Sequence, residues 1–88
     1  MANNIKKEIY VVGIVEADVS AADYVSEHEG RNIAGFIIDS TDAPATLKIT
    51  DALGNTTQLA YDAGYHPISL TKIHNDGSNS ITTVKVFY

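Results

Sequence analysis

Residues 46–61 read TLKITDALGNTTQLAY, and this stretch decides the fold class. Its two ends, 46–50 and 56–61, are rich in β-branched and aromatic residues, which favour strands. Between them, DALGN provides Gly54 for the positive φ angle that a tight loop needs. Two strand-like segments joined by a short loop with a glycine predict a β-hairpin.

Two further segments predict strands downstream of this hairpin. Residues 67–73, PISLTKI, and residues 80–88, SITTVKVFY, flank the stretch HNDGSN at 74–79. The Asn, Asp and Gly residues of that stretch favour a tight turn, which predicts a second hairpin. In the last segment Val84 and Val86 alternate with polar residues, as expected for a half-buried strand.

The segments before the central hairpin complete the fold prediction. Residues 6–15 and 32–39 are also strand-like, and STDAPA at 40–45 marks a turn after the second of them. The chain then has about six short antiparallel strands. We predict an all-β fold, either a small β-sandwich or a jelly-roll-like barrel. No repeat or linker divides the chain, so residues 1–88 are predicted to form a single β-domain.

Residues 20–29 are ambiguous between a short helical turn and an irregular loop. Ser20 could cap a helix, Asp23 follows three residues later as in a capping box, and Gly30 could end it. The stripe of apolar residues along this segment is weak. The sequence leaves both alternatives open.

The chain lacks the covalent staples that stabilise many small domains. A chain of 88 residues buries only about 60–65% of the surface that its unfolded form exposes, so its core is thin. Without cysteine it has neither disulfides nor thiolate metal sites, and oligomerisation is the remaining common way to gain burial. Residues 6–15 become apolar on both faces after Ile9, and VKVFY at 84–88 ends on two aromatic residues. Both segments are therefore predicted to be tied into a sheet or against another subunit.

Charge and hydropathy argue against nucleic-acid and membrane partners. The net charge is −5 with only six Lys and Arg residues, so no basic stripe is available to follow a phosphate backbone. The apolar run IYVVGIV at 9–15 is too short to span a membrane. We expect a soluble, unprocessed protein that binds neither nucleic acid nor membrane.

The best metal-site candidate combines Asp62, His66, His74 and Asp76. About eight residues of extended chain separate the two histidines, so one ion cannot bridge them unless a second copy contributes. A Ser69, His66, Asp62 triad lacks a nucleophile elbow. The acid pairs Glu16 with Asp18 and Glu27 with Glu29 lie in polar stretches typical of solvated carboxylates. We therefore predict no enzyme, no metal and no cofactor.

Residues 64–88, GYHPISLTKIHNDGSNSITTVKVFY, resemble the C-terminal hairpin of small virion proteins of tailed bacteriophages. Upstream, GRNIAGFIID at 30–39 and TLKITDALGNTTQLAY at 46–61 look like the family's preceding strand and its D-x-x-G hairpin, through Asp51 and Gly54. The likeness covers roughly residues 30–88. The positions that carry it in the last segment are Gly64, His66, Pro67, Ile68, Leu70, Lys72, Ile73, Gly77, Ser78, Asn79, Ser80, Ile81, Val84, Val86, Phe87 and Tyr88.

The resemblance implies a non-enzymatic virion structural protein with no catalytic residue to map. Such proteins commonly assemble as homotrimers on the capsid surface as decoration (cement) proteins, or form head fibres or tail pieces. The expected partners are further copies of the chain and the major capsid protein, and the expected location is the virion, after synthesis in the host cytoplasm. The alternative is a tail or head-fibre adhesion module that binds carbohydrate through Tyr24 and Tyr65 at loop tips.

The candidate subunit or capsid contacts come from the two apolar segments near the chain ends. They are Ile9, Tyr10, Val11, Val12, Val84, Val86, Phe87 and Tyr88.

Overall fold

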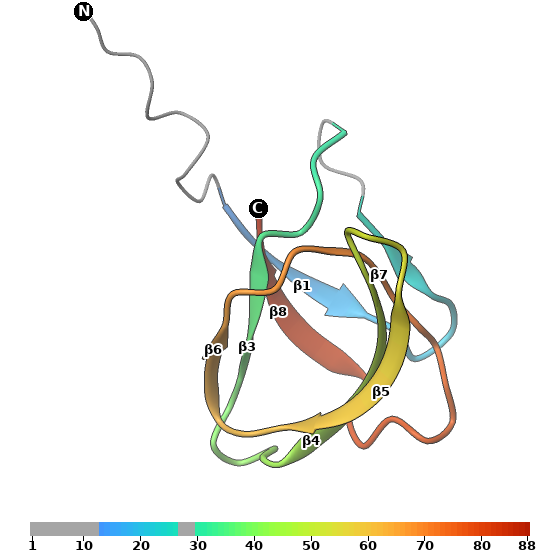
Figure 1. The fold of residues 1–88 in the computed structure, drawn as a ribbon. Coiled ribbons are helices and arrows are strands. Elements are labelled where there is room, and N and C mark those ends of the chain that lie inside the picture. Colours follow the sequence, from blue (N-terminus) through green and yellow to red (C-terminus); the bar gives the residue numbers. More distant parts are fainter. Residues whose placement is uncertain (1–12, 27–29) are drawn as a thin grey trace, which may run out of the picture.

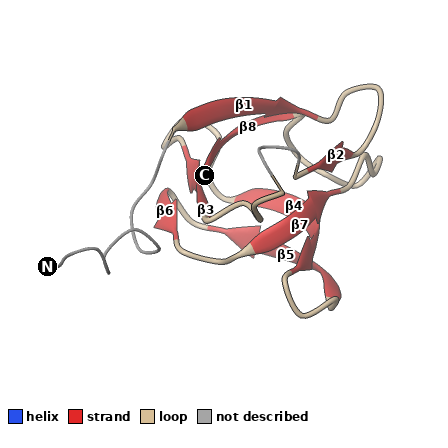
Figure 2. Ribbon diagram, turned by 90° about the horizontal axis from the view of Figure 1, so that it is seen from above, coloured by secondary structure: helices blue, strands red, loops and turns tan. Residues whose placement is uncertain are grey.

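A computed structural model describes residues 13–26 and 30–88, which form eight strands and no helix. The strands are β1 (Ile14–Asp18), β2 (Tyr24–Val25), β3 (Gly35–Ile38), β4 (Ala45–Asp51), β5 (Thr56–Tyr61), β6 (Gly64–His66), β7 (Leu70–Ile73) and β8 (Thr83–Phe87). They make two antiparallel sheets with the strand orders β1-β8-β3-β6 and β2-β7-β4-β5. Figure 2 shows the two sheets as facing layers, which confirms the predicted all-β, sandwich-like fold. In the described ranges, no helix is long and apolar enough to cross a membrane.

The hairpin predicted at residues 46–61 is confirmed. β4 pairs with β5 in an unbroken antiparallel register from Ala45↔Tyr61 to Thr50↔Thr56. Gly54 has the expected positive φ of 91°. The Asp51 carboxylate accepts the backbone N–H groups of Leu53 and Asn55, both at 2.9 Å, and so holds the loop closed.

Both strands of this hairpin continue into the other sheet. β3 precedes β4 and β6 follows β5, and β3 and β6 pair with each other at Phe36↔His66. The segments 39–44 and 62–63 thus carry a paired ribbon from one sheet to the other (Figure 1). Beside this bend, the rings of Phe36, Tyr61 and His66 pack with centroids 5.1–5.2 Å apart. The ribbon therefore fixes how the two sheets face each other.

The core lies between the sheets and is filled from both. The buried hydrophobic residues are Ala17, Val19, Ile33, Phe36, Ile38, Ala45, Leu47, Ile49, Tyr61, Leu70, Ile73, Val84, Val86 and Tyr88. No polar or charged residue is buried in the described part of the chain. β8 lies between β1 and β3, which confirms that the apolar C-terminal segment is tied into a sheet.

The second predicted hairpin, across residues 74–79, is wrong. β7 pairs with β2 and β4, whereas β8 pairs with β1 and β3 in the opposite sheet. The turn itself forms, because the N–H of Asn79 donates to the Asp76 carbonyl oxygen at 2.9 Å. Turn residues specify a change of chain direction but not which strand the following segment pairs with. Here the turn begins a crossover to the other sheet, where β8 pairs with β1 and β3.

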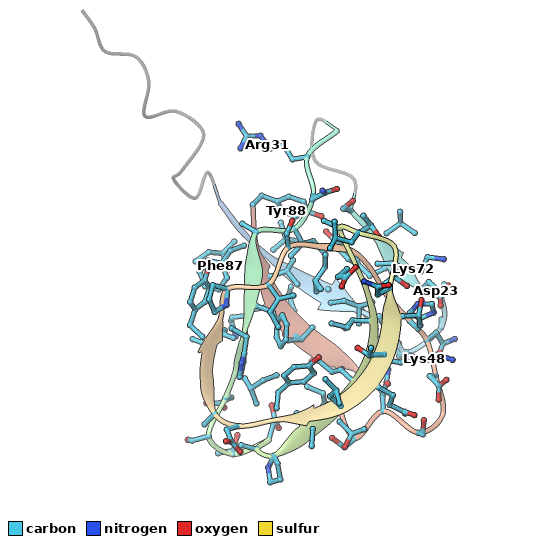
Figure 3. The ribbon with its side chains drawn as sticks, in the orientation of Figure 1. Asp23, Arg31, Lys48, Lys72, Phe87 and Tyr88 are labelled. Atoms are coloured by element: carbon cyan, nitrogen blue, oxygen red, sulfur yellow. The ribbon has the colours of Figure 1, made fainter. Side chains whose placement is uncertain are left out.

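The helical alternative at residues 20–29 is also wrong over the described residues 20–26. Tyr24 and Val25 form β2 and pair with Ile73 and Lys72 of β7. The Asp23 carboxylate accepts the N–H of Asn75 at 2.7 Å and lies 3.9 Å from the Lys72 Nζ atom (Figure 3). Asp23 thus ties this segment to β7 and does not cap a helix. Residues 27–29 lie outside the described residues. With β2 and β6 added, the strands number eight and not about six.

The crossover after β7 covers the edge of β4 with hydrogen bonds. Thr46 N–H donates to the Ser80 hydroxyl at 2.8 Å, and Lys48 N–H donates to the Asn79 side-chain oxygen at 3.0 Å. The Asn79 amide nitrogen in turn donates to the His74 carbonyl oxygen at 2.8 Å. One asparagine side chain therefore satisfies a strand donor and a loop acceptor together.

Asn79→Ala is expected to lower the free energy of unfolding by about 1–3 kcal/mol, because it leaves the Lys48 N–H and the His74 carbonyl without this partner. Urea denaturation monitored by circular dichroism would measure the change. Asn75→Ala is the matched control, since Asn75 contributes only its backbone N–H to the hydrogen bonds of the described residues. Equal effects of the two substitutions would contradict this role for Asn79.

Candidate functional site

The predicted contact residues occupy different environments. Ile9, Tyr10, Val11 and Val12 lie outside the described residues. Val84, Val86 and Tyr88 point into the core and are between 0 and 4% exposed. Phe87 is half-buried, because its side chain lies on the opposite face of β8 from these three. Of these four C-terminal side chains, Phe87 offers the most surface to a partner.

The outer face of the β1-β8-β3-β6 sheet carries an apolar cluster around Phe87. Ile14 is directly opposite Phe87 on β1, and Tyr65 is directly opposite Ile37 on β6. The Tyr65 ring packs edge-on against Phe87 with centroids 5.1 Å apart. Ile14 is 60% exposed, Tyr65 47% and Ile37 36%. We call Ile14, Ile37, Tyr65 and Phe87 the outer patch.

Gly35 makes this arrangement of the outer patch feasible. It is opposite Phe87 on β3, and a Cβ atom there would lie 2.6 Å from the Tyr65 hydroxyl oxygen and 2.8 Å from the His66 carbonyl oxygen. Such distances are too short for a real carbon atom. The absence of a side chain therefore lets Tyr65 lie across the sheet toward Phe87.

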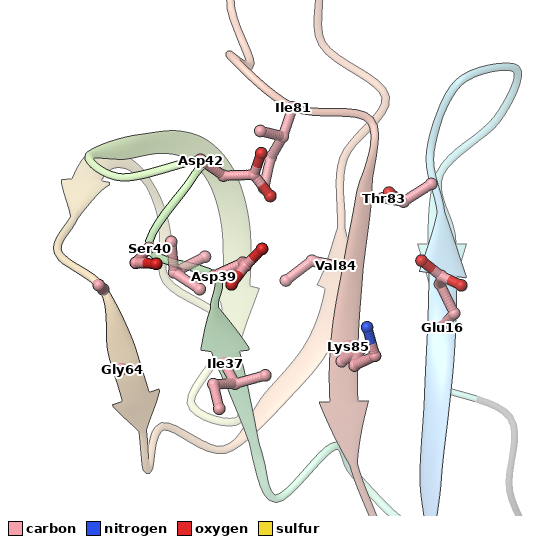
Figure 4. A pocket seen from close by; sticks show the side chains of 12 residues that line it. Glu16, Ile37, Asp39, Ser40, Asp42, Gly64, Ile81, Thr83, Val84 and Lys85 are labelled. Carbon is pink, nitrogen blue, oxygen red and sulfur yellow. The ribbon is translucent and has the colours of Figure 1, made fainter.

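A pocket of about 610 Å³ lies next to the outer patch, where β3 ends and β8 begins. Figure 4 shows the Asp39 and Asp42 carboxylates turned toward the hollow, with Lys85 and Glu16 along its other side. Ile37 belongs to both the pocket and the patch. The charged groups that line the pocket are three carboxylates and one ammonium group, that of Lys85. Among the described residues Lys85 forms no ion pair. The charge of the pocket is suited to a basic group of a partner.

His66 and His74 belong to opposite sheets, His66 on β6 and His74 directly after β7. His66 is on β6, where its Nε2–H donates to the Asp62 carbonyl oxygen at 2.8 Å. His74 follows β7, and its Nε2 atom lies 2.7 Å from the Thr50 hydroxyl. Within the described ranges no three His, Asp or Glu residues are grouped as metal ligands.

Of the carboxylates considered for acid catalysis, Glu27 and Glu29 lie outside the described residues, and Asp18 differs from what such chemistry needs. Asp18 lies exposed on β1, and hydrogen bonds from the hydroxyl and the N–H of Ser20 lower its pKa below 3.8. A general acid at neutral pH needs a raised pKa. Glu16 is also exposed, on the same face of the strand. Ser69, of the hypothetical triad, lies between β6 and β7, and its carbonyl oxygen accepts the Ala52 N–H at 2.9 Å.

The tyrosines considered for carbohydrate binding are in strands and not at loop tips. Tyr24 is in β2, and its hydroxyl lies 2.9 Å from the Tyr88 hydroxyl. Tyr65 is in β6 and packs against Phe87. Their rings are therefore placed by contacts within the domain.

Sequence reasoning missed most of the outer patch and the pocket. Period-two alternation in 83–87 separates Phe87 and Lys85 from Val84 and Val86, and this signal could have divided the candidate contacts into inner and outer sets. Ile14, Ile37 and Tyr65 could not be grouped with Phe87, because the strand order that joins them is not written in the local sequence. Comparison of the chain with protein-family models, with curated proteins and with solved structures finds no match.

Gly35→Ala is expected to lower the free energy of unfolding by about 1–3 kcal/mol, because Tyr65 and the His66 backbone must move away from the new methyl group. Thermal or urea unfolding would measure the change. Gly77→Ala is the control, since a Cβ atom at Gly77 meets nothing within 4 Å and that residue has no positive φ. A Gly35→Ala variant as stable as the Gly77→Ala variant would contradict the close packing of Tyr65 over Gly35.

Asp76 is expected to contribute stability that is lost in acid. The hydroxyl and the N–H of Ser78 donate to its carboxylate, and Lys48 lies 3.5 Å away, so its pKa in the folded protein is below 3.8. Because the folded pKa is lower than the unfolded one, the contribution is present above pH 3.8 and disappears as the pH falls through the folded pKa.

Asp76→Asn should therefore reduce stability at neutral pH and bring the variant and the parent closer together as the pH falls below 3.8. Urea midpoints at a series of pH values would test this. Asp62→Asn is the control, because the Asp62 carboxylate has no hydrogen bond or ion pair with the other described residues. A stability difference between Asp76→Asn and the parent that does not change with pH would refute the role of Asp76.

Proposed function

We propose that this protein is a virion structural protein of a tailed phage, a capsid decoration (cement) protein that assembles as a homotrimer on the capsid surface and stabilises the shell. The observation that carries the proposal is the outer patch, an exposed apolar cluster on the open face of the β1-β8-β3-β6 sheet. The resemblance of residues 30–88 to small phage virion proteins directs the proposal to the capsid.

The outer patch has the composition of a contact surface. Exposed apolar residues that lie together, and not singly, mark sites where a partner removes them from water. Tyr65 and Phe87 provide large rings whose positions are already fixed by contact with each other. A partner that covers the patch gains burial without ordering these side chains, which lowers the entropic cost of binding.

The pocket adds electrostatic selection to this apolar contact. Glu16, Asp39 and Asp42 face the hollow with Lys85, and Ile37 connects them to the outer patch. A basic side chain from the partner would complement the excess of carboxylates. In a closed trimer each subunit presents two different surfaces to its neighbours, so the patch would meet an unlike surface of another subunit or of the major capsid protein.

Ile14→Lys is expected to weaken assembly and capsid binding by at least tenfold, because it places an ammonium group in the apolar contact, at a cost of about 1.4 kcal/mol or more. Light scattering would give the mass of the chain in solution, and co-sedimentation would give its binding to purified phage capsids. The parent chain should have three times the mass of one subunit, or a multiple of it, and should sediment with the capsids.

Val25→Lys is the matched control, because Val25 is 50% exposed but lies on β2 in the other sheet. It should assemble and bind as the parent does. A parent chain that is a folded monomer and does not bind capsids would contradict the proposal. Equal losses of assembly and capsid binding in Ile14→Lys and Val25→Lys would show that the outer patch is not the contact surface.

A further inference from the structure

Among the described residues, the strand β5 leaves a long edge of the second sheet without a partner. In the order β2-β7-β4-β5 it pairs only with β4. Residues 56–60 are all exposed, and TTQLAY contains no charged residue and no proline. Natural proteins protect free edges with charges, prolines, bulges or very short strands, because an open edge can pair with another chain.

The other sheet edges in the described part of the chain are protected in these ways. β2 is two residues long and β6 is three. β1 carries the charged side chains of Glu16 and Asp18. β5 has six residues and none of these features, so it is the edge best suited to accept a further strand.

Hydrogen bonds on the far side of β4 establish which groups of β5 are free. The N–H groups of Thr46 and Lys48 donate to Ser80 and Asn79, away from β5. In an antiparallel sheet, the backbone N–H and C=O groups of successive residues point alternately to the strand on one side and to the strand on the other. The residues of β5 that pair with Thr46 and Lys48 therefore also point their N–H and C=O groups away from the β4–β5 ladder. Those residues are Ala60 and Gln58, and Thr56 follows the same alternation.

Leu59 shows that the inner side of the sheet is incomplete at this edge. It is directly opposite Leu47, which is fully buried, so both side chains point toward the core side. Leu59 is nevertheless 54% exposed, because no strand from residues 13–26 or 30–88 lies beyond β5 to cover it. An added strand would cover this leucine in the same step that satisfies the free backbone groups.

We propose that two copies of the chain join by antiparallel pairing of their β5 edges about a two-fold axis at Leu59. In this register Gln58 of each copy pairs with Ala60 of the other, and the two Leu59 side chains meet in a non-hydrogen-bonded pair with Cα atoms about 4.5 Å apart. A second copy suits this edge because β5 has no charged side chains, so two β5 strands can pair without like-charge repulsion. The two β2-β7-β4-β5 sheets become one continuous sheet.

This inference goes beyond the proposed function, because the β5 edge belongs to the sheet that does not carry the outer patch. A contact at each surface would let one subunit join its trimer through the outer patch and join a neighbouring trimer through β5. The two contacts can be tested separately by substitutions at Ile14 and at Leu59.

A single cysteine tests the register, because the chain has none of its own. Leu59→Cys in the full chain at micromolar concentration, treated with glutathione disulfide as the two-electron oxidant, should form a disulfide-linked dimer, since the paired Cα atoms in the proposed register lie within disulfide range. The rate, followed on non-reducing gels, should exceed that of Leu53→Cys by at least about tenfold. Leu53 is the matched control because it is 87% exposed at the tip of the same hairpin.

Two outcomes overturn the proposal. The first is that Leu59→Cys forms the disulfide-linked dimer no faster than Leu53→Cys. The second is that Leu59→Lys, which places two ammonium groups next to each other in the proposed pair, has the same mass as the parent chain in sedimentation at high concentration. Pairing of β5 with a strand of a different protein would give the first outcome. Cross-linking of Leu59→Cys that persists when Ile14→Lys is added supports the proposal even if the outer patch has no role in assembly.

Discussion

The structure depends on one constraint, that a single paired ribbon belongs to both sheets. β3 and β4 on one strand of the ribbon, and β6 and β5 on the other, keep their partners as they pass from one layer to the next. An 88-residue chain without cysteine needs such a link, because its core is too small to hold two independent sheets together. A second link comes from Ile33, which pairs with Leu70 of the opposite sheet through two hydrogen bonds of 2.9 Å.

The ribbon also separates the two surfaces to which we assign contacts. Where it belongs to the β1-β8-β3-β6 sheet, it contributes Ile37 and Tyr65 to the outer patch. Where it belongs to the β2-β7-β4-β5 sheet, it contributes the free edge of β5. Local charge distinguishes them further, since the pocket beside the patch is lined by carboxylates whereas β5 is uncharged. The first surface suits a partner with basic groups, and the second suits a strand that resembles itself.

Local pattern was sufficient for the parts of the fold that are local. The hairpin at 46–61 and the alternation of Val84 and Val86 both follow from short-range chemistry, and both are confirmed. The hairpin at 74–79 was wrong because its residues encode a turn, while the choice of receiving sheet depends on pairing with β1 and β3 far away in the sequence. β2 was missed for the same reason, since a two-residue strand is defined by its partner β7 and not by its own composition. The outer patch contains residues from four strands that only the sheet order brings together, so it cannot be predicted from any single segment of the sequence.

The central position of β8 has a consequence for the time course of folding. β1 and β3 do not pair with each other, because β8 lies between them and pairs with both. The pair Ile14↔Phe87 brings together residues that are separated by most of the sequence. The central hairpin can close early because its loop is short, but the first sheet must wait for contacts of large sequence separation. On the ribosome, β3 can pair first with β6, whereas β1, which pairs with β8 in the described structure, would remain unpaired until β8 has been synthesised.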